Sequence, residues 1–274
     1  MEVGLAMFCT DYAIAPTELA RALEDRGFDS LWFPEHSHIP LGRESEWPQG
    51  GELPKKYFDV MDPFVVMGAA AAVTTSLKVA TGICLVPQRD VIQTAKEVAT
   101  IDQVSNGRFL FGIGAGWNRD EMENHGTVFK TRHKLMREKI EAMRAIWTET
   151  KPEYHGDMVD FGPMMTWPKP VQQTPPVFVG GEFPYGARRA LAYGDGWLPH
   201  AKRPTYTLLE KLPEFRAMEK EAGRSIPITA FGVEHDPDSW SAYADAGVDR
   251  IVLSIDSESS NIVLPKLDEW AKRL

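Results

Sequence analysis

The feature that most constrains the fold is a regular alternation between short apolar runs and amphipathic segments, which repeats eight times along the chain. Uncharged runs are typical of strands buried on both faces, and apolar residues at helical spacing are typical of helices that cover such strands. We expect strands at residues 3–8, 30–33, 78–86, 108–116, 176–181, 196–200, 226–233 and 250–255. Eight strand–helix units predict an α/β fold, a closed (β/α)8 TIM barrel that spans residues 1–274 as a single domain.

Helices connect these strands, and two long insertions interrupt the alternation. We expect helices at residues 17–26, 62–75, 91–104, 132–148, 185–193, 205–222, 239–246 and 262–274. Residues 39–61, after the second strand, are rich in proline, glycine and charge, and long loops of this kind are often lids or binding loops. We expect this loop to close over a substrate. Residues 150–175, before the fifth strand, should cover the face of the barrel away from catalysis.

Composition limits the partners of the chain. Its 30 basic and 39 acidic residues give a net charge of −9 without any cluster of lysine and arginine, so nucleic acid and anionic membrane surfaces are not expected partners. No apolar run approaches the ~20 residues of a membrane span, and the N-terminus begins directly with a strand instead of a signal peptide. Cys9 and Cys84 lie far apart in apolar runs, as expected of reduced cysteines in a cytoplasmic protein.

Glycines gather at the ends of the expected strands, which is where barrels of this kind carry their chemistry. Gly112, Gly114 and Gly116 end the fourth strand at alternate positions, and Gly180 and Gly181 end the fifth, just before a helix. Bare backbone and a helix N-terminus can hold a flat ligand and its phosphate. Tight packing alone is an alternative explanation. A dinucleotide-binding fingerprint fits less well, because it needs a third glycine three residues after the second, and a tryptophan stands there.

Histidines follow other strands. His36 and His38 come after the second strand, His200 after the sixth, and Asp256 after the eighth, so a metal-dependent hydrolase is one interpretation. Such sites usually need further ligands from the middle strands, which here end in glycine, and we expect no metal. His36 is a candidate for hydrogen bonding or proton transfer, because histidine titrates near neutral pH. A histidine on a polar turn without a catalytic role is the alternative.

Four segments have a joint spacing that is specific, although each is weak alone. They are Thr81-Gly82-Ile83, residues 95–102 followed by Ser105-Asn106-Gly107-Arg108, residues 112–117, and residues 175–181. In this combination the chain resembles the bacterial luciferase-like oxidoreductases, and most closely the branch that uses the deazaflavin coenzyme F-420. The resemblance extends from Val3 to about Asp256. It implies a luciferase-like barrel, a homodimer and hydride-transfer chemistry that belongs mainly to the cofactor.

The resemblance also implies the residues of the site. The ring of the cofactor would lie over a bulge in the third strand, where relatives hold a non-prolyl cis peptide, here between Gly82 and Ile83. The acidic residue and histidine after the second strand would stand beside the reactive position of the ring, and the glycines after the fifth strand would meet the phosphate. The residues assigned to the cofactor are Glu35, Thr81, Gly82, Ile83, Gly114, Gly116, Trp117, Asp120, Gly180 and Gly181, with His36 as the catalytic residue.

One position departs from the family pattern. The deazaflavin-dependent sugar-phosphate dehydrogenases of this family carry a glutamate as proton donor directly after the glycines of the fourth strand, where this chain has Trp117. Basic residues for a substrate phosphate are not evident in the sequence either. We therefore do not expect a sugar-phosphate substrate. We expect Trp117 to line an apolar substrate space or to stack on a ring.

Together these observations predict a coenzyme F-420-dependent oxidoreductase that transfers a hydride between the deazaflavin and a small organic substrate. The first alternative is an FMN-dependent monooxygenase that uses reduced FMN and oxygen. The second alternative is a barrel that binds a flavin-like ligand without catalysis, as a carrier or sensor. The identity of the cofactor distinguishes the first two hypotheses, and a measurable redox rate distinguishes both of them from the third.

Replacing His36 by alanine separates the catalytic hypotheses from the carrier hypothesis. We expect His36→Ala to slow turnover about 100-fold or more, the usual contribution of a positioned proton-transfer group, while cofactor affinity stays near that of the wild type. Steady-state rates and the quenching of ligand fluorescence measure the two quantities. An unchanged redox rate in the variant would support binding without catalysis.

Overall fold

Parallel strands form the wall of a barrel in the computed structural model, which describes residues 1–274 apart from the side chain of Pro237. The barrel strands are β1 (Glu2–Ala6), β2 (Ser30–Phe33), β3 (Lys78–Thr81), β4 (Cys84–Leu85), β5 (Phe109–Gly114), β8 (Val177–Gly180), β9 (Gly196–Leu198), β12 (Thr229–Val233) and β13 (Arg250–Ser254). Hydrogen bonds join them in the order β12-β13-β1-β2-β3-β5-β8-β9, and β4 pairs with β5. Parallel bridges from Trp197 to Ile228 and from His200 to Phe231 bring β9 against β12 and close the ring.

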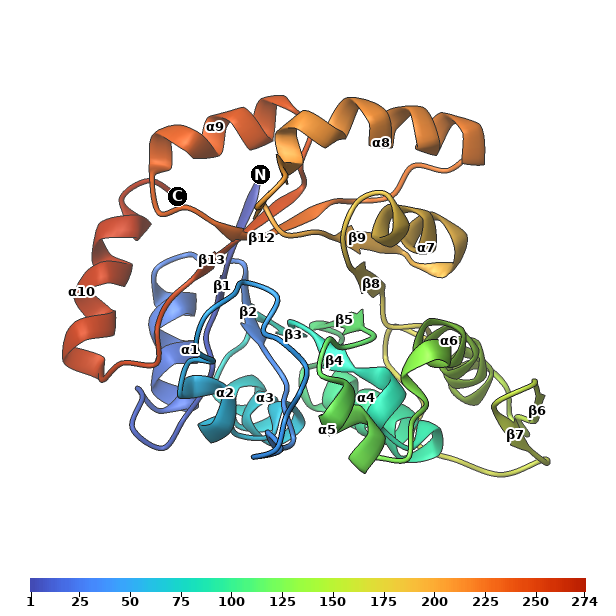
Figure 1. The fold of residues 1–274 in the computed structure, drawn as a ribbon. Coiled ribbons are helices and arrows are strands. Elements are labelled where there is room, and N and C mark those ends of the chain that lie inside the picture. The colour runs from blue at the N-terminus through green and yellow to red at the C-terminus, as the bar shows by residue number, and fades with distance from the viewer.

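Helices surround these strands on the outside of the barrel (Figure 1). They are α1 (Pro16–Asp25), α2 (Lys56–Asp59), α3 (Pro63–Ala72), α4 (Val91–Val104), α5 (Arg119–Asn124), α6 (Arg132–Thr148), α7 (Tyr185–Tyr193), α8 (Leu208–Ala222), α9 (Pro237–Asp245) and α10 (Ser260–Ala271), with short 3-10 turns η1 (Val86–Gln88) and η2 (Phe129–Thr131). Strands and helices alternate in the predicted order. The predicted (β/α)8 barrel is therefore confirmed.

Large apolar side chains fill the inside of the barrel. Residues of a strand point alternately inward and outward, and the inward ones form a separate buried cluster. Its members are Ala6, Trp32, Ala80, Leu110, Phe178, Leu198 and Val252, and Ile83 and Phe231 pack on it. The rings of Trp32 and Phe178 meet edge to face at 6.2 Å, and the Trp32 indole donates a hydrogen bond to the Ser30 hydroxyl (2.9 Å). The barrel is thus a packed core with no open channel through this layer.

A bulge interrupts the third barrel strand, which the sequence predicts as one strand over residues 78–86. The peptide between Gly82 and Ile83 is cis, as the family resemblance implies. Before the bulge, the Gly82 N–H donates to the Phe33 carbonyl (2.8 Å). After it, β4 pairs with β5 through Cys84 opposite Ile113. The strand therefore changes its pairing at the place where the resemblance puts the cofactor ring.

Several short elements of the structure are missing from the sequence prediction, namely α2, α5 and two hairpins. The short helix α5 begins after Asn118, whose side chain accepts a hydrogen bond from the Glu121 N–H (3.3 Å). A hairpin of β10 (Lys202–Arg203) and β11 (Tyr206–Thr207) occupies the start of the helix expected at residues 205–222. That helix begins only at Leu208, because Thr207 and Glu210 form a capping box there.

The insertion before the fifth barrel strand packs on the outside of the barrel. It contains the hairpin of β6 (Tyr154–His155) and β7 (Asp160–Phe161), which lies at the outer edge beside α6 (Figure 1). The Glu138 carboxylate on α6 accepts the N–H groups of Met158 (2.8 Å) and Val159 (3.2 Å). The hairpin thus packs on α6 at the outer side of the barrel, and the role of the insertion as a cover stays a prediction.

Glycines at the end of β5 make room for the bulge. A Cβ atom on Gly114 would lie 1.8 Å from Cδ1 of Ile83, and one on Gly112 would lie 2.0 Å from the carbonyl oxygen of Thr81. The sequence analysis expects bare backbone here for a ligand. In the structure, atoms of Thr81 and Ile83 on the neighbouring strand occupy the space beside these two glycines. Tight packing between the strands therefore explains why glycine stands at both positions.

The variant Gly112→Ala tests this packing. A methyl group 2.0 Å from a backbone oxygen cannot be relieved by rotating a side chain, so we expect the free energy of unfolding to fall by about 3 kcal/mol or more. Urea unfolding measures the change. Gly42→Ala is the control, since no atom lies within 4 Å of its Cβ position. Equal stability of the two variants would contradict the packing account.

Candidate active site

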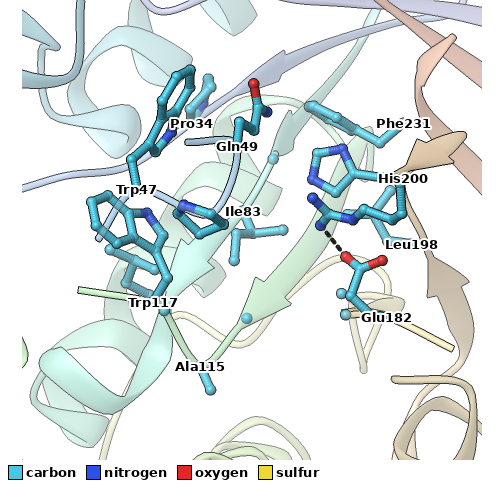
Figure 2. Close-up of a pocket in the computed structure, with 18 of the residues that line it drawn as sticks. Pro34, Trp47, Gln49, Ile83, Ala115, Trp117, Glu182, Leu198, His200 and Phe231 are labelled. Carbon is cyan, nitrogen blue, oxygen red and sulfur yellow. Dashed lines mark hydrogen bonds and ion pairs between the residues drawn. The ribbon is translucent and has the colours of Figure 1, made fainter. Parts of the chain in front are cut away.

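A cavity of about 940 Å³ lies at the carboxyl ends of the barrel strands, in the size range of cofactor and substrate sites. Figure 2 shows Ile83 between two walls, with Trp47 and Trp117 on one side and His200 and Phe231 on the other. The cavity rests on the apolar interior of the barrel, because Ile83 and Phe231 also pack on the buried cluster there. The 39–61 loop and the β10–β11 hairpin complete its lining.

Most residues predicted from the sequence line this cavity. They are Glu35, His36, Gly82, Ile83, Gly114, Gly116, Trp117, Gly180 and Gly181. The cavity lining does not include Thr81 or Asp120. Thr81 is buried and donates its hydroxyl to the Gly112 carbonyl (2.7 Å). Asp120 accepts hydrogen bonds from the N–H (3.0 Å) and the hydroxyl (2.7 Å) of Ser45, so it binds the 39–61 loop.

The carboxylate of Glu35 is engaged by the protein itself. It accepts the N–H of Leu85 (2.6 Å) and the Nε–H of Arg89 (2.6 Å). Arg89 also pairs with Glu97 (2.8 Å), so the buried carboxylate belongs to a network of charges. Glu35 therefore ties the end of β2 to the segment after the bulge, in addition to lining the cavity.

His36 is held by a buried glutamate that the sequence analysis does not identify. Its Nδ1 lies 2.7 Å from Oε2 of Glu121, and the two side chains are 6% and 0% exposed. The other oxygen, Oε1, accepts the N–H of Ser37 (3.1 Å). A carboxylate on one ring nitrogen fixes the orientation and the tautomer of an imidazole. Nε2 of His36 is thus the nitrogen left for a ligand.

Two side chains near the end of β8 have buried nitrogens without a hydrogen-bond partner among the described residues. Arg189 on α7 and His133 on α6 line the cavity, and Nε of Arg189 and Nδ1 of His133 are buried with no hydrogen-bond partner among the described residues. A Cβ on Gly181 would lie 2.9 Å from Nη2 of Arg189, so glycine lets the guanidinium approach the backbone. Burial, followed by the charges of Arg189 and Arg132, lowers the pKa of His133 to about 4. Buried donors without partners cost free energy, and a bound anion would satisfy them.

The opposite wall carries a paired carboxylate, Glu182, and a histidine, His200. Glu182 accepts hydrogen bonds from Arg203 and from the Tyr206 hydroxyl (2.8 Å), and Figure 2 marks the Arg203 pair with a dashed line. His200 stands edge to face on Phe231, with ring centroids 5.7 Å apart. Burial, followed by the charge of Arg203, lowers the pKa of His200 to about 4. His200 is therefore a neutral imidazole at pH 7.

The histidines considered for a metal lie apart. Among the described residues, no group of three or more histidine, cysteine, aspartate or glutamate side chains has the arrangement of a metal site. His36 is bound to Glu121, and His38 contacts the Ser37 hydroxyl (2.9 Å). Asp256 pairs with Lys56 (2.7 Å). Each of these potential ligands thus has a partner within the protein.

The barrel, its cis bulge and the cavity beside it define the luciferase-like class of oxidoreductases. Residues 15–239 match the model of the luciferase-like monooxygenase family, and the chain belongs to that family. Its members are oxidoreductases and monooxygenases, so the protein is an enzyme of the oxidoreductase class. The resemblance seen in the sequence is confirmed, and the non-catalytic alternative loses its support.

Two relatives illustrate the range of the family. An uncharacterized protein of Mycobacterium tuberculosis is 37% identical over 100% of this chain and 99% of its own length. The FMNH2-dependent dimethylsulfone monooxygenase of Pseudomonas putida is 27% identical over 70% of this chain and 53% of its own length. No helix of the described residues is long and apolar enough to span a bilayer.

Solved structures share the fold over the full chain. The monooxygenase RslO1 from Streptomyces bottropensis superposes with a TM-score of 0.80 at 19% identity, covering 100% of this chain and 98% of its own. The coenzyme F-420-dependent tetrahydromethanopterin reductase from Methanopyrus kandleri gives 0.76 at 18% identity, with 100% and 99% coverage. An F-420-dependent secondary alcohol dehydrogenase gives 0.76 at 20% identity, with 100% and 98% coverage. At such identities these matches show the common fold.

Two half-buried histidines, His133 and His200, predict a loss of stability in mild acid. Both have a pKa of about 4 in the folded protein and near 6.5 in the unfolded chain. The unfolded state therefore binds more protons in this interval, and the free energy of unfolding falls as the pH drops from 6.5 toward 4. For His200 alone we expect a loss of about 2 kcal/mol between pH 7 and pH 5.

Urea unfolding of His200→Phe at pH 7 and pH 5 measures this contribution. We expect the variant to lose less stability between these pH values than the wild type, because it no longer titrates. His155→Gln is the control, since His155 is exposed on the β6–β7 hairpin and its pKa is raised, by hydrogen bonding to Asp160. A full acid dependence in His200→Phe would show that another group causes it.

Proposed function

We propose that this oxidoreductase uses coenzyme F-420 and transfers a hydride between the deazaflavin and a small organic substrate. One observation carries the proposal. A single cavity contains a histidine bound to a buried glutamate and, at another place in its lining, buried nitrogens of Arg189 and His133 that have no partner among the described residues. A flat redox ring with an anionic tail has groups that match both.

The residues of the cavity fit such a ligand. The ring would lie against Gly82 and Ile83 of the bulge. Its phosphate would accept hydrogen bonds from Arg189 and His133, whose buried nitrogens lack partners among the described residues. Hydrogen bonds from a charged guanidinium such as that of Arg189 are among the strongest that proteins make, and the N-terminus of α7 adds backbone donors nearby.

The chemistry divides between ligand and protein. A bound deazaflavin supplies or accepts the hydride, and the protein orients the reactants and keeps water away. His36 would hold or release a proton at the substrate through Nε2, because Glu121 occupies Nδ1. Glu121 would act as a positioning residue that keeps the imidazole in this tautomer.

The choice of F-420 over FMN rests on the extent of the similarity. The F-420-dependent reductase and dehydrogenase match this chain over 98% or more of their own lengths. The FMN-bound diketocamphane monooxygenase from Pseudomonas putida and the dimethylsulfone monooxygenase are matched over only 67% and 53% of theirs. An FMN-dependent monooxygenase is the second candidate, and the TM-score of 0.80 with monooxygenase RslO1 favours it. That the protein is cytoplasmic, that it is a homodimer and that it forms a single domain stay predictions from the sequence.

Titration of the purified protein with F-420 and with FMN, followed by quenching of ligand fluorescence, tests the proposal. We expect tighter binding of F-420. We expect Arg189→Ala to weaken F-420 binding about tenfold or more, since it removes a charged donor to the phosphate. Arg188→Ala is the matched control, because Arg188 lies over the exposed Tyr185 ring. Tighter binding of FMN would favour the monooxygenase, and equal effects of the two variants would contradict the phosphate assignment.

A further inference from the structure

A continuous line of aromatic rings forms one wall of the cavity. Tyr57 lies at its centre, with ring centroids 4.7 Å from Phe8, 5.3 Å from His36 and 5.9 Å from Trp47. His36 also meets Trp117 edge to face at 5.8 Å. Figure 2 shows Trp47 and Trp117 on this side of the cavity. The imidazole of His36 thus lies within a surface of large aromatic rings.

The charged groups elsewhere in the lining are already in use. The carboxylate of Glu35 is bound by Leu85 and Arg89, and that of Glu182 is bound by Arg203 and a tyrosine hydroxyl. The unpartnered donors of Arg189 and His133 are assigned to the cofactor phosphate. No free charge of the lining is therefore left to pair with a charged substrate beside His36.

Hydrogen bonds between Ser45 and Asp120, here called the Asp120–Ser45 latch, hold this wall in place. Trp47 and Tyr57 belong to the 39–61 loop, and the loop is fixed to α5 at Ser45. The Asp120 carboxylate accepts both the N–H (3.0 Å) and the hydroxyl (2.7 Å) of Ser45, whose hydroxyl oxygen also accepts the N–H of Arg119 (2.9 Å). These hydrogen bonds lower the pKa of Asp120, which keeps the carboxylate ionised and able to accept them.

We propose that the aromatic wall formed by Phe8, Trp47, Tyr57 and Trp117 is the substrate compartment, that it selects uncharged molecules with an apolar, ring-sized body, and that the Asp120–Ser45 latch maintains it. The substrate would direct its one polar group to Nε2 of His36. This inference rests on the proposed function, since it takes the bulge and the region of Arg189 and His133 as the place of the cofactor.

The preference for uncharged substrates follows from the free-energy cost of removing water from a charged ligand. The Arg43 guanidinium lies over the Trp117 ring at 5.4 Å but is not part of the cavity lining. An anion placed among the rings inside the cavity would therefore lose its water without gaining a direct cationic partner, which is unfavourable. Aromatic rings attract cations, but Arg43 already makes this contact with Trp117. A neutral, flat molecule gains ring contacts without either cost.

Three ketones of similar shape test the selection: acetophenone, the anion 4-acetylbenzoate and the cation 4-(aminomethyl)acetophenone. They are titrated by ligand-observed NMR against enzyme saturated with oxidised F-420, which has no hydride to transfer, so binding is measured without turnover. We expect acetophenone to bind about tenfold or more tightly than either charged ketone. Equal or tighter binding of a charged ketone, or no binding of any of the three, would overturn the inference.

Variants locate the compartment. We expect Trp47→Ala to weaken acetophenone binding about tenfold, and Asp120→Ala to weaken it several-fold by releasing the loop, with F-420 affinity unchanged in both. Trp167→Ala is the matched control, because Trp167 is exposed on the 150–175 insertion. An effect of Trp167→Ala equal to that of Trp47→Ala would contradict the assignment.

The outcome also separates this inference from the proposed function. If F-420 does not bind, the proposed cofactor is wrong, and the three ketones are titrated against the free enzyme. The aromatic wall still predicts a preference for acetophenone there. If F-420 binds while the preference among the ketones is absent, the cofactor proposal stands and the substrate compartment is refuted.

Discussion

Two neighbouring residues at the end of β2 engage different parts of the protein, and the candidate site depends on both. The Glu35 carboxylate binds the Leu85 N–H and Arg89, each at 2.6 Å, and so ties β2 to the segment after the cis bulge. His36 reaches Glu121 on α5 at 2.7 Å. Removing one member of a buried charge pair typically costs 3–5 kcal/mol. The adjacent residues Glu35 and His36 therefore fix the position of the bulge and the orientation of the imidazole beside it.

The rest of the cavity divides into regions of different chemistry around this pair. Apolar side chains of the barrel interior form the base at Ile83 and Phe231. The guanidinium of Arg189 and the neutral imidazole of His133 lie near the end of β8, and aromatic rings surround His36. Such a division suits a ligand with a flat ring and an anionic tail, together with a second, uncharged reactant. The apolar walls also exclude water, which strengthens the electrostatic interactions within.

The sequence predicts the barrel and much of the site, because both depend on local signals. Buried strands, helix periodicity and strand-end glycines are visible in a few consecutive residues, and nine predicted residues around His36 and Ile83 line the cavity. The partners missed come from distant elements. Glu121 lies 85 residues from His36, and no local pattern connects the two. The start of α8 did carry a local signal, since Thr207 and Glu210 have the spacing of a capping box.

The central claim is that the cis bulge and the histidine beside it receive a tricyclic redox ring whose phosphate lies between Arg189 and His133. A crystal structure of the protein with F-420 bound tests it most directly. The account predicts the ring against Ile83, its reactive edge toward His36, and phosphate oxygens about 3 Å from Arg189 and His133. A ring bound away from the bulge, or a phosphate that contacts neither Arg189 nor His133, would contradict it.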